Sequence, residues 1–92
     1  MICAMDCDGT LIDFDGNPRP EIVDLYHWFE HHGYAMVVWS HAGRKHAADT
    51  CAKLGLTPSK ILTKNEWGGN RVYPDVAVDD LDLHIAKNMV KV

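Results

Sequence analysis

The chain contains 92 residues, of which 47% are hydrophobic and 24% charged, and its formal net charge is −4. This length leaves room for one hydrophobic core, so we expect residues 1–92 to form a single domain. Because the net charge is negative, the protein has no overall positive potential that would attract long nucleic acids. The sequence has no run of about 18 apolar residues and no leader pattern, so we expect neither a membrane span nor secretion. Three cysteines without CxxC spacing favour reduced, buried thiols and a cytoplasmic protein.

The first half of the chain alternates predicted strands and helices. Residues 2–5 form an apolar run typical of a strand that is buried on both faces. Within residues 18–33, prolines at the start, apolar residues at i, i+3, i+4 and i+7, and Gly33 at the end predict a helix. Residues 34–39 predict a second buried strand, and residues 44–54 a second helix that Gly55 closes.

The second half is predicted to add two strands and a short helix. Residues 61–62 and 76–78 read as strands, residues 67–70 as a loop, and residues 83–89 as a final helix. Strands that alternate with helices imply crossover connections and a parallel sheet covered on both faces. We therefore expect an α/β fold, a three-layer α/β/α Rossmann-like sandwich with a small parallel sheet.

Polar side chains follow three of the predicted strands. Asp6 and Asp8 come after the first strand, Ser40 after the second, and Asp79 and Asp80 after the last. Ligands of open parallel sheets bind at the carboxyl ends of the strands. These five residues are therefore the first candidates for a functional site.

The run DCDGTL at residues 6–11 resembles the first signature motif of the haloacid dehalogenase-like superfamily. Ser40 resembles the second motif of that family and Asp79-Asp80 the fourth, in the same order along the chain. The resemblance covers nearly the whole sequence. It implies a magnesium-dependent phosphatase, a phosphoric monoester hydrolase without a cap domain.

The residue types of these motifs suit the chemistry that the resemblance implies. Asp6 would take the phosphoryl group as an aspartyl phosphate, and Asp8 would protonate the leaving oxygen and later deprotonate water. Clustered carboxylates that face an anionic substrate require a hard cation, for which magnesium is the natural ion. By resemblance, Asp6 gives it a carboxylate oxygen, Asp8 its backbone carbonyl, and one or both of Asp79 and Asp80 the remaining carboxylate.

Further residues are expected to hold the phosphoryl group. Ser40, the amide of His41 and the side chain of Arg44 are candidates to bind its oxygens. The third motif of the family is a lysine or arginine, and both Lys64 and Arg71 compete for it. Lys64 fits the more usual spacing, whereas Arg71 precedes a Val-Tyr-x-Asp run found in small capless members.

Other interpretations of the same residues stay open. The DxDG turn could be held merely by side-chain hydrogen bonds, and Ser40 or the paired aspartates could be helix caps. His27 and His31 have the i, i+4 spacing of a zinc site but lack an evident third ligand. At the level of function, the alternatives are a non-catalytic phosphate- or partner-binding module and a phosphotransferase.

The resemblance also bears on the substrate. Neither of the positions at which this family inserts a lid has room for one here. An open site favours a bulky or macromolecular phosphoester, such as a nucleic-acid end or a phosphoprotein, unless another subunit of an oligomer supplies the lid.

Overall fold

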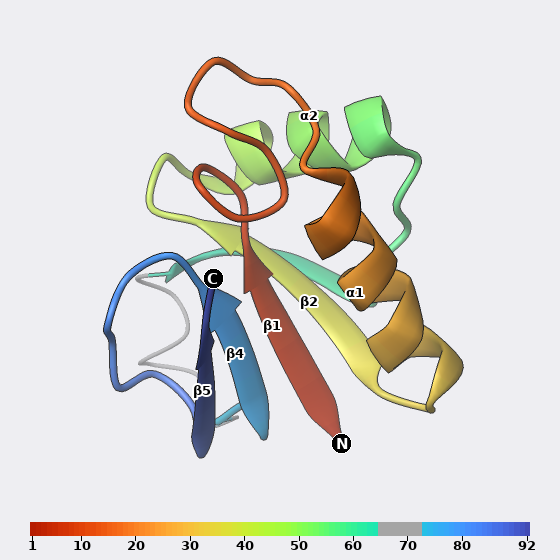
Figure 1. Cartoon of the computed structure of the whole chain (residues 1–92), viewed down its shortest axis with the longest axis vertical. Coiled ribbons are helices and arrows are strands. Elements are labelled where there is room, and N and C mark those ends of the chain that lie inside the picture. Colours follow the sequence, from red (N-terminus) through yellow and green to blue (C-terminus); the bar gives the residue numbers. More distant parts are fainter. Residues whose placement is uncertain (65–72) are drawn as a thin grey trace.

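The computed structural model describes residues 1–64 and 73–92, which form one five-stranded, all-parallel sheet and two helices (Figure 1). The strands are ordered β3-β2-β1-β4-β5. Their bounds are Ile2–Asp6 for β1, Ala35–Ser40 for β2, Lys60–Thr63 for β3, Val76–Asp79 for β4 and Asn88–Lys91 for β5. The helices are α1 (Pro20–His31) and α2 (Arg44–Leu54).

The strand β1 is the middle strand of the five and pairs with β2 on one edge and with β4 on the other. Met5 is in register with Val38 of β2 and with Val78 of β4. All three residues are fully buried, as expected for a parallel sheet whose strands are apolar on both faces. The register also brings Asp6 level with Trp39, one residue before Ser40, so the polar ends of β1 and β2 lie side by side.

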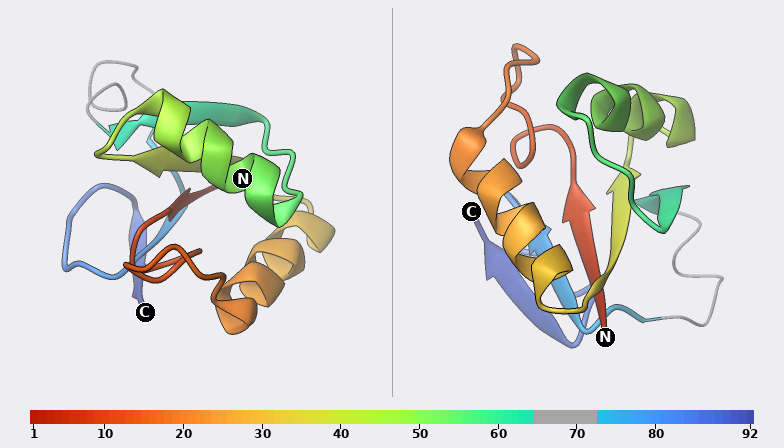
Figure 2. Two further views of the ribbon diagram at one scale, coloured as in Figure 1. Left: turned by 90° about the horizontal axis from the view of Figure 1, so that it is seen from above. Right: turned by 90° about the vertical axis from the view of Figure 1, so that its right-hand side faces the viewer.

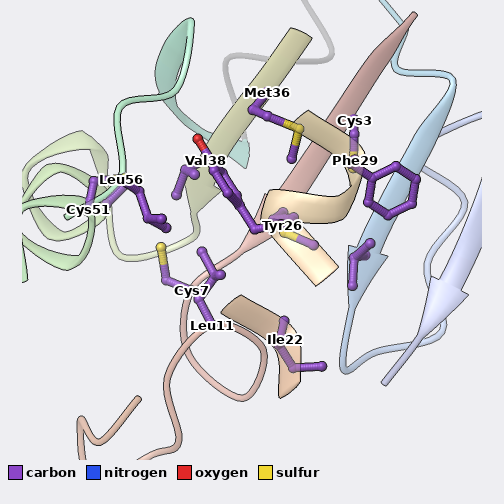
Figure 3. Close-up of a cluster of buried hydrophobic side chains, with 13 residues drawn as sticks. Cys3, Cys7, Leu11, Ile22, Tyr26, Phe29, Met36, Val38, Cys51 and Leu56 are labelled. Atoms are coloured by element: carbon purple, nitrogen blue, oxygen red, sulfur yellow. The ribbon is translucent and has the colours of Figure 1, made fainter. Parts of the chain in front are cut away.

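Both helices pack on the same face of the sheet (Figure 2). Pro20 occupies the first turn of α1, where the missing N–H costs nothing, and α2 ends at Gly55 in the left-handed conformation. Ile22, Tyr26 and Phe29 of α1 share one hydrophobic cluster with Ala47 and Cys51 of α2 (Figure 3). The side chains of this cluster that come from the sheet are Cys3, Met5, Met36, Val38 and Val78.

A second hydrophobic cluster covers the opposite face. Val37 and Trp39 of β2 pack there with Ala77 of β4 and with Ala86, and Ile85 lies against them. Ile85 and Ala86 belong to the connection between β4 and β5. In the described part of the chain, α1 and α2 thus form one layer on the sheet, and a connecting segment covers part of the other face.

The predicted parallel sheet, the strands β1 to β4 and the two helices are confirmed, with ends that shift by one or two residues. The helix predicted for residues 83–89 is wrong, because residues 88–91 form β5 in parallel with β4. The edge of β4 carries backbone groups that need hydrogen-bond partners, and β5 supplies them. This tertiary requirement outweighs the local pattern of apolar residues.

Three further expectations concern the cysteines, membrane spans and the loop at residues 67–70. Cys3, Cys7 and Cys51 are buried and free, and burial raises the pKa of the Cys7 thiol to about 12. Neither α1 nor α2 has the length and apolar character that crossing a membrane requires. The loop predicted at residues 67–70 lies outside the described residues.

Candidate active site

An open pocket of about 300 Å³ lies at the carboxyl ends of the strands. Parallel strands bring these ends to one edge, so residues far apart in sequence meet there. Asp6 ends β1, Ser40 ends β2, and Lys64 follows β3 directly. The residues that line the pocket are Asp6, Asp8, Phe14, Ser40, His41, Ala42, Lys64, Asp80 and Leu81.

The deepest part of the site is a buried arrangement of three charged side chains. The Nζ atom of Lys64 lies 3.0 Å from Oδ1 of Asp6 and 2.6 Å from Oδ2 of Asp79. The side chains of Lys64, Asp6 and Asp79 are only 5%, 8% and 0% exposed. One ammonium therefore bridges two carboxylates that water scarcely reaches, and the three groups together carry one negative charge.

Burial changes the protonation of this part of the site. It raises the pKa of Asp6 from 3.8 to about 6; Asp79 adds to the rise, while Lys64 and the backbone N–H of Cys7 oppose it. Burial by itself lowers the pKa of Lys64, but the contacts with Asp79 and Asp6 more than reverse this and raise it. Lys64 is therefore a fixed cation, and Asp6 is mostly ionised only above about pH 6.

The turn after β1 holds the second oxygen of Asp6. Oγ1 of the fully buried Thr10 donates a hydrogen bond of 3.3 Å to Asp6 Oδ2. Thr10 reaches this position because the chain turns back at Gly9, whose φ is +82°, and the N–H of Thr10 donates to the carbonyl of Cys7. Thr10 was not among the predicted site residues, although it lies within the DCDGTL run and only four residues after Asp6.

Gly9 also allows the carboxylate of Asp80 to lie against the same turn. A Cβ atom at Gly9 would lie 2.4 Å from Oδ2 of Asp80, so any other residue there would displace this carboxylate. Asp80 thereby approaches the end of β1 from the end of β4. Asp6, Asp79 and Asp80 each present one carboxylate oxygen, and these oxygens lie within 4.8 Å of one another.

The donors at this point fit a hard divalent cation. Magnesium prefers oxygen ligands, and carboxylates are its usual protein donors. Three ionised carboxylates and the Lys64 ammonium sum to a charge of −2, which one divalent ion would neutralise. Asp6, Asp79 and Asp80 are therefore the residues that could hold it. Of the two terminal aspartates, Asp80 lines the pocket, whereas Asp79 is fully buried and engaged by Lys64 and by the N–H of Leu81.

Asp8 lies farther out than Asp6 and makes a different contact. Its side chain is 41% exposed, and its two carboxylate oxygens lie 3.0 and 3.1 Å from Nε2 of His46 in the first turn of α2. The sequence-based prediction did not include His46. A histidine six residues after the polar end of a strand is a weak signal, because only the path of the chain into α2 brings it back to Asp8.

The predicted phosphate-binding residues do not all meet in the pocket. Ser40 is buried and lines it; its Oγ accepts the N–H of Ala42 at 3.0 Å, which leaves the O–H to donate. His41 is exposed and also lines the pocket. Arg44 is exposed and is not part of the pocket wall. Arg71 lies outside the described residues.

An ordered loop forms one side of the pocket mouth. The carboxylate of Asp13 accepts the N–H groups of Asp15 and Asn17, and Arg19 donates to the carbonyl of Gly9 at 2.6 Å. Phe14 stands in this loop with 80% of its surface exposed, and Leu81, which also lines the pocket, is 49% exposed. The mouth is therefore apolar in part, whereas the floor is charged.

Comparisons of the chain with protein-family models, with curated proteins and with solved structures give no match.

Proposed function

We propose that this chain is a capless, magnesium-dependent phosphatase of the haloacid dehalogenase-like superfamily. The observation that carries the proposal is the ammonium of Lys64, 3.0 Å from Asp6 at the wall of a pocket that Asp8 also lines. A buried carboxylate, an adjacent fixed cation and a second, more exposed carboxylate are the parts that covalent phosphoryl transfer requires.

In the first step, a carboxylate oxygen of Asp6 attacks the phosphorus, and the bond to the leaving oxygen breaks. Asp8 gives its proton to that oxygen, so the alcohol leaves neutral. In the second step, Asp8 takes a proton from water, whose oxygen attacks the phosphorus. The bond to Asp6 then breaks, and inorganic phosphate leaves with both aspartates restored.

Two side chains and a metal ion would stabilise the charge that the phosphoryl group carries. Lys64 contacts Asp6 and lines the pocket, so its ammonium can reach the phosphoryl oxygens, which supports Lys64 as the cation of the third motif. Ser40 can donate its O–H to another oxygen. Asp6, Asp80 and the backbone carbonyl of Asp8 would hold magnesium, which would supply positive charge next to the substrate. Asp79 acts mainly by holding Lys64.

The finer description of the fold belongs to this proposal. We propose that residues 1–92 form one catalytic core, a three-layer Rossmann-like sandwich without a cap. The layer of α1 and α2 on one face of the parallel sheet and the packing of Ile85 and Ala86 on the other face support three layers, and the polar residues at the carboxyl ends of the strands support a catalytic core. The open mouth is compatible with a bulky phosphoester such as a nucleic-acid end or a phosphoprotein. The buried, free cysteines support a cytoplasmic location.

Hydrolysis of p-nitrophenyl phosphate, measured with magnesium and with EDTA, tests the proposal. We expect release of nitrophenolate and phosphate only with magnesium, and none from Asp6→Asn, whose amide is nearly isosteric but a poor nucleophile. Asp24→Asn, which makes the same change at an exposed position of α1, is the matched control and should keep wild-type turnover.

The alternatives give different outcomes in the same assay. A non-catalytic phosphate-binding module releases nothing, and its affinity for inorganic phosphate can then be measured by calorimetry. A phosphotransferase, given an alcohol as acceptor, releases more nitrophenolate than phosphate. Turnover in a pure sample of Asp6→Asn equal to that of the wild type would contradict the mechanism directly.

A further inference from the structure

The contact between His46 and Asp8 has no part in the steps above. Asp8 lines the pocket, whereas His46 is not among the residues that line it. Nε2 of His46 is 3.0 Å from one oxygen of Asp8 and 3.1 Å from the other. With its proton on Nε2, the ring donates to both oxygens at once and so limits rotation of the carboxylate.

The two partners differ in how firmly the fold holds them. His46 belongs to α2, which is fixed on the sheet by Ala47 and Cys51, and its carbonyl accepts the hydroxyl of Thr50 at 2.9 Å. Asp8 stands in the turn after β1 with 41% of its side chain exposed. An exposed carboxylate on a turn samples several rotamers unless a neighbour restricts it. The helix therefore supplies a fixed backbone for His46, and the contact restricts the exposed side chain of Asp8.

We infer that His46 is a positioning residue that holds the carboxyl group of Asp8 in place for proton transfer to the leaving group and, in the second step, from water. The inference rests on the proposed function, since it concerns the residue that acts as acid and base there. His46 itself exchanges no proton with the substrate in this account. Its contribution is orientation, because a general acid must stand within hydrogen-bond reach of the oxygen that it protonates.

The way in which kcat depends on the leaving group distinguishes this role from a merely structural one. Nitrophenolate leaves readily without a proton, whereas an alkoxide does not, so a misplaced acid slows an alkyl phosphate far more than an aryl phosphate. The experiment measures kcat and KM of the wild type, His46→Ala and His46→Gln with p-nitrophenyl phosphate and with benzyl phosphate. The Gln amide retains a donor near the place of Nε2.

We expect His46→Ala to lower kcat for benzyl phosphate roughly tenfold or more, a part of the ~10²–10⁴-fold that general acids contribute. KM should change little, and kcat for p-nitrophenyl phosphate should fall much less. His46→Gln should recover most of the loss. In an Asp8→Asn background, His46→Ala should have no further effect, because both changes act on the same proton transfer.

The control is His27→Ala, which removes another histidine with a carboxylate neighbour, Glu30 at 3.4 Å, on the exposed side of α1. It should leave both substrates unaffected. An equal loss with both substrates, an effect on KM alone, or no effect of His46→Ala overturns the inference. A gain in turnover also overturns it, because the contact would then hold Asp8 in a resting orientation. The proposed function is judged separately by turnover of the wild type, whose absence overturns both.

Discussion

The deep and the outer parts of the candidate site both pair carboxylates with a nitrogen base, but they differ in how far water reaches them. In the deep part, Lys64, Asp6 and Asp79 are each at most 8% exposed; in the outer part, Asp8 and His46 are 41% and 36% exposed. Buried charges are costly unless they are paired, whereas exposed pairs contribute little to stability. The deep part is thus constrained by charge balance, and the outer part by orientation.

Removal of the deep cation should have the largest effect. In Lys64→Met, Asp6 and Asp79 lose their common partner, and truncation of a buried pair commonly costs about 3–5 kcal/mol of unfolding free energy. Turnover should fall roughly 10²-fold or more, as when one preorganised electrostatic donor is lost. Urea denaturation and phosphatase kinetics on the same sample measure the two effects.

Lys45→Met provides the contrast on the surface. Lys45 lies 3.0 Å from Asp49, and the two side chains are 89% and 66% exposed. This variant should change stability and turnover little, because water solvates each charge without the other. Similar losses of stability in Lys45→Met and Lys64→Met would show that burial does not distinguish the two parts of the molecule in the way described.

The raised pKa of Asp6 predicts an effect of pH on the metal-free protein. Between pH 3.8 and about 6, Asp6 is ionised in the unfolded chain but still protonated in the folded one. The folded state then binds more protons, so this residue lowers stability as pH rises through that window, and its full cost is present above about pH 6. The difference between 3.8 and about 6 corresponds to on the order of 3 kcal/mol.

Asp6→Asn removes this titration. In EDTA, the variant should match the wild type near pH 4 and become progressively more stable than it up to about pH 7. Urea denaturation of both proteins at four pH values in this range measures the difference. If the wild type gained stability relative to Asp6→Asn as pH rises, the contact with Lys64 would outweigh burial, and the deep part would favour the ionised carboxylate.

The sequence predicted the sheet and its polar edge because both depend on local patterns. Apolar runs that end at Asp6, Ser40 and Asp79 identify buried parallel strands, whose carboxyl ends meet by topology. The contact between His46 and Asp8 could not be read in this way, since it depends on how α2 leaves β2. The strand β5 was missed for a similar reason, because the free edge of β4 is a property of the whole sheet.

The choices that the sequence left open are questions of side-chain distance. Spacing left both Lys64 and Arg71 open, with Lys64 at the more usual distance along the chain; the structure places Lys64 3.0 Å from Asp6, and Arg71 lies outside the described residues. Asp79 and Asp80 are adjacent in sequence, yet consecutive residues at the end of a strand point in different directions. The side chain of Asp79 turns inward to Lys64, and that of Asp80 reaches the pocket and Gly9.

The third prediction uses this difference between the two aspartates and has the smallest expected effect. A cation that binds only the folded state raises stability by mass action, by about 2.7 kcal/mol at a free concentration ~100 times Kd. Magnesium should therefore raise the Tm of the wild type in thermal denaturation followed by circular dichroism. Asp80→Asn should lose most of this rise, because it removes the carboxylate that faces the pocket.

Asp82→Asn is the matched control for this measurement, because it removes a nearby carboxylate that is 89% exposed and lies 3.9 Å from Lys91. It should keep the full magnesium-dependent rise in Tm. Sodium chloride at the same ionic strength should not reproduce the rise, since screening acts on all exposed charges alike, whereas a bound ion acts at one place.

Without magnesium, Asp80→Asn should be at least as stable as the wild type, since one of three crowded carboxylates is gone. If Asp80→Asn kept the full magnesium-dependent rise in Tm, the ion would not be bound by Asp80. It would then have to bind among the buried carboxylates, where Lys64 already supplies the positive charge.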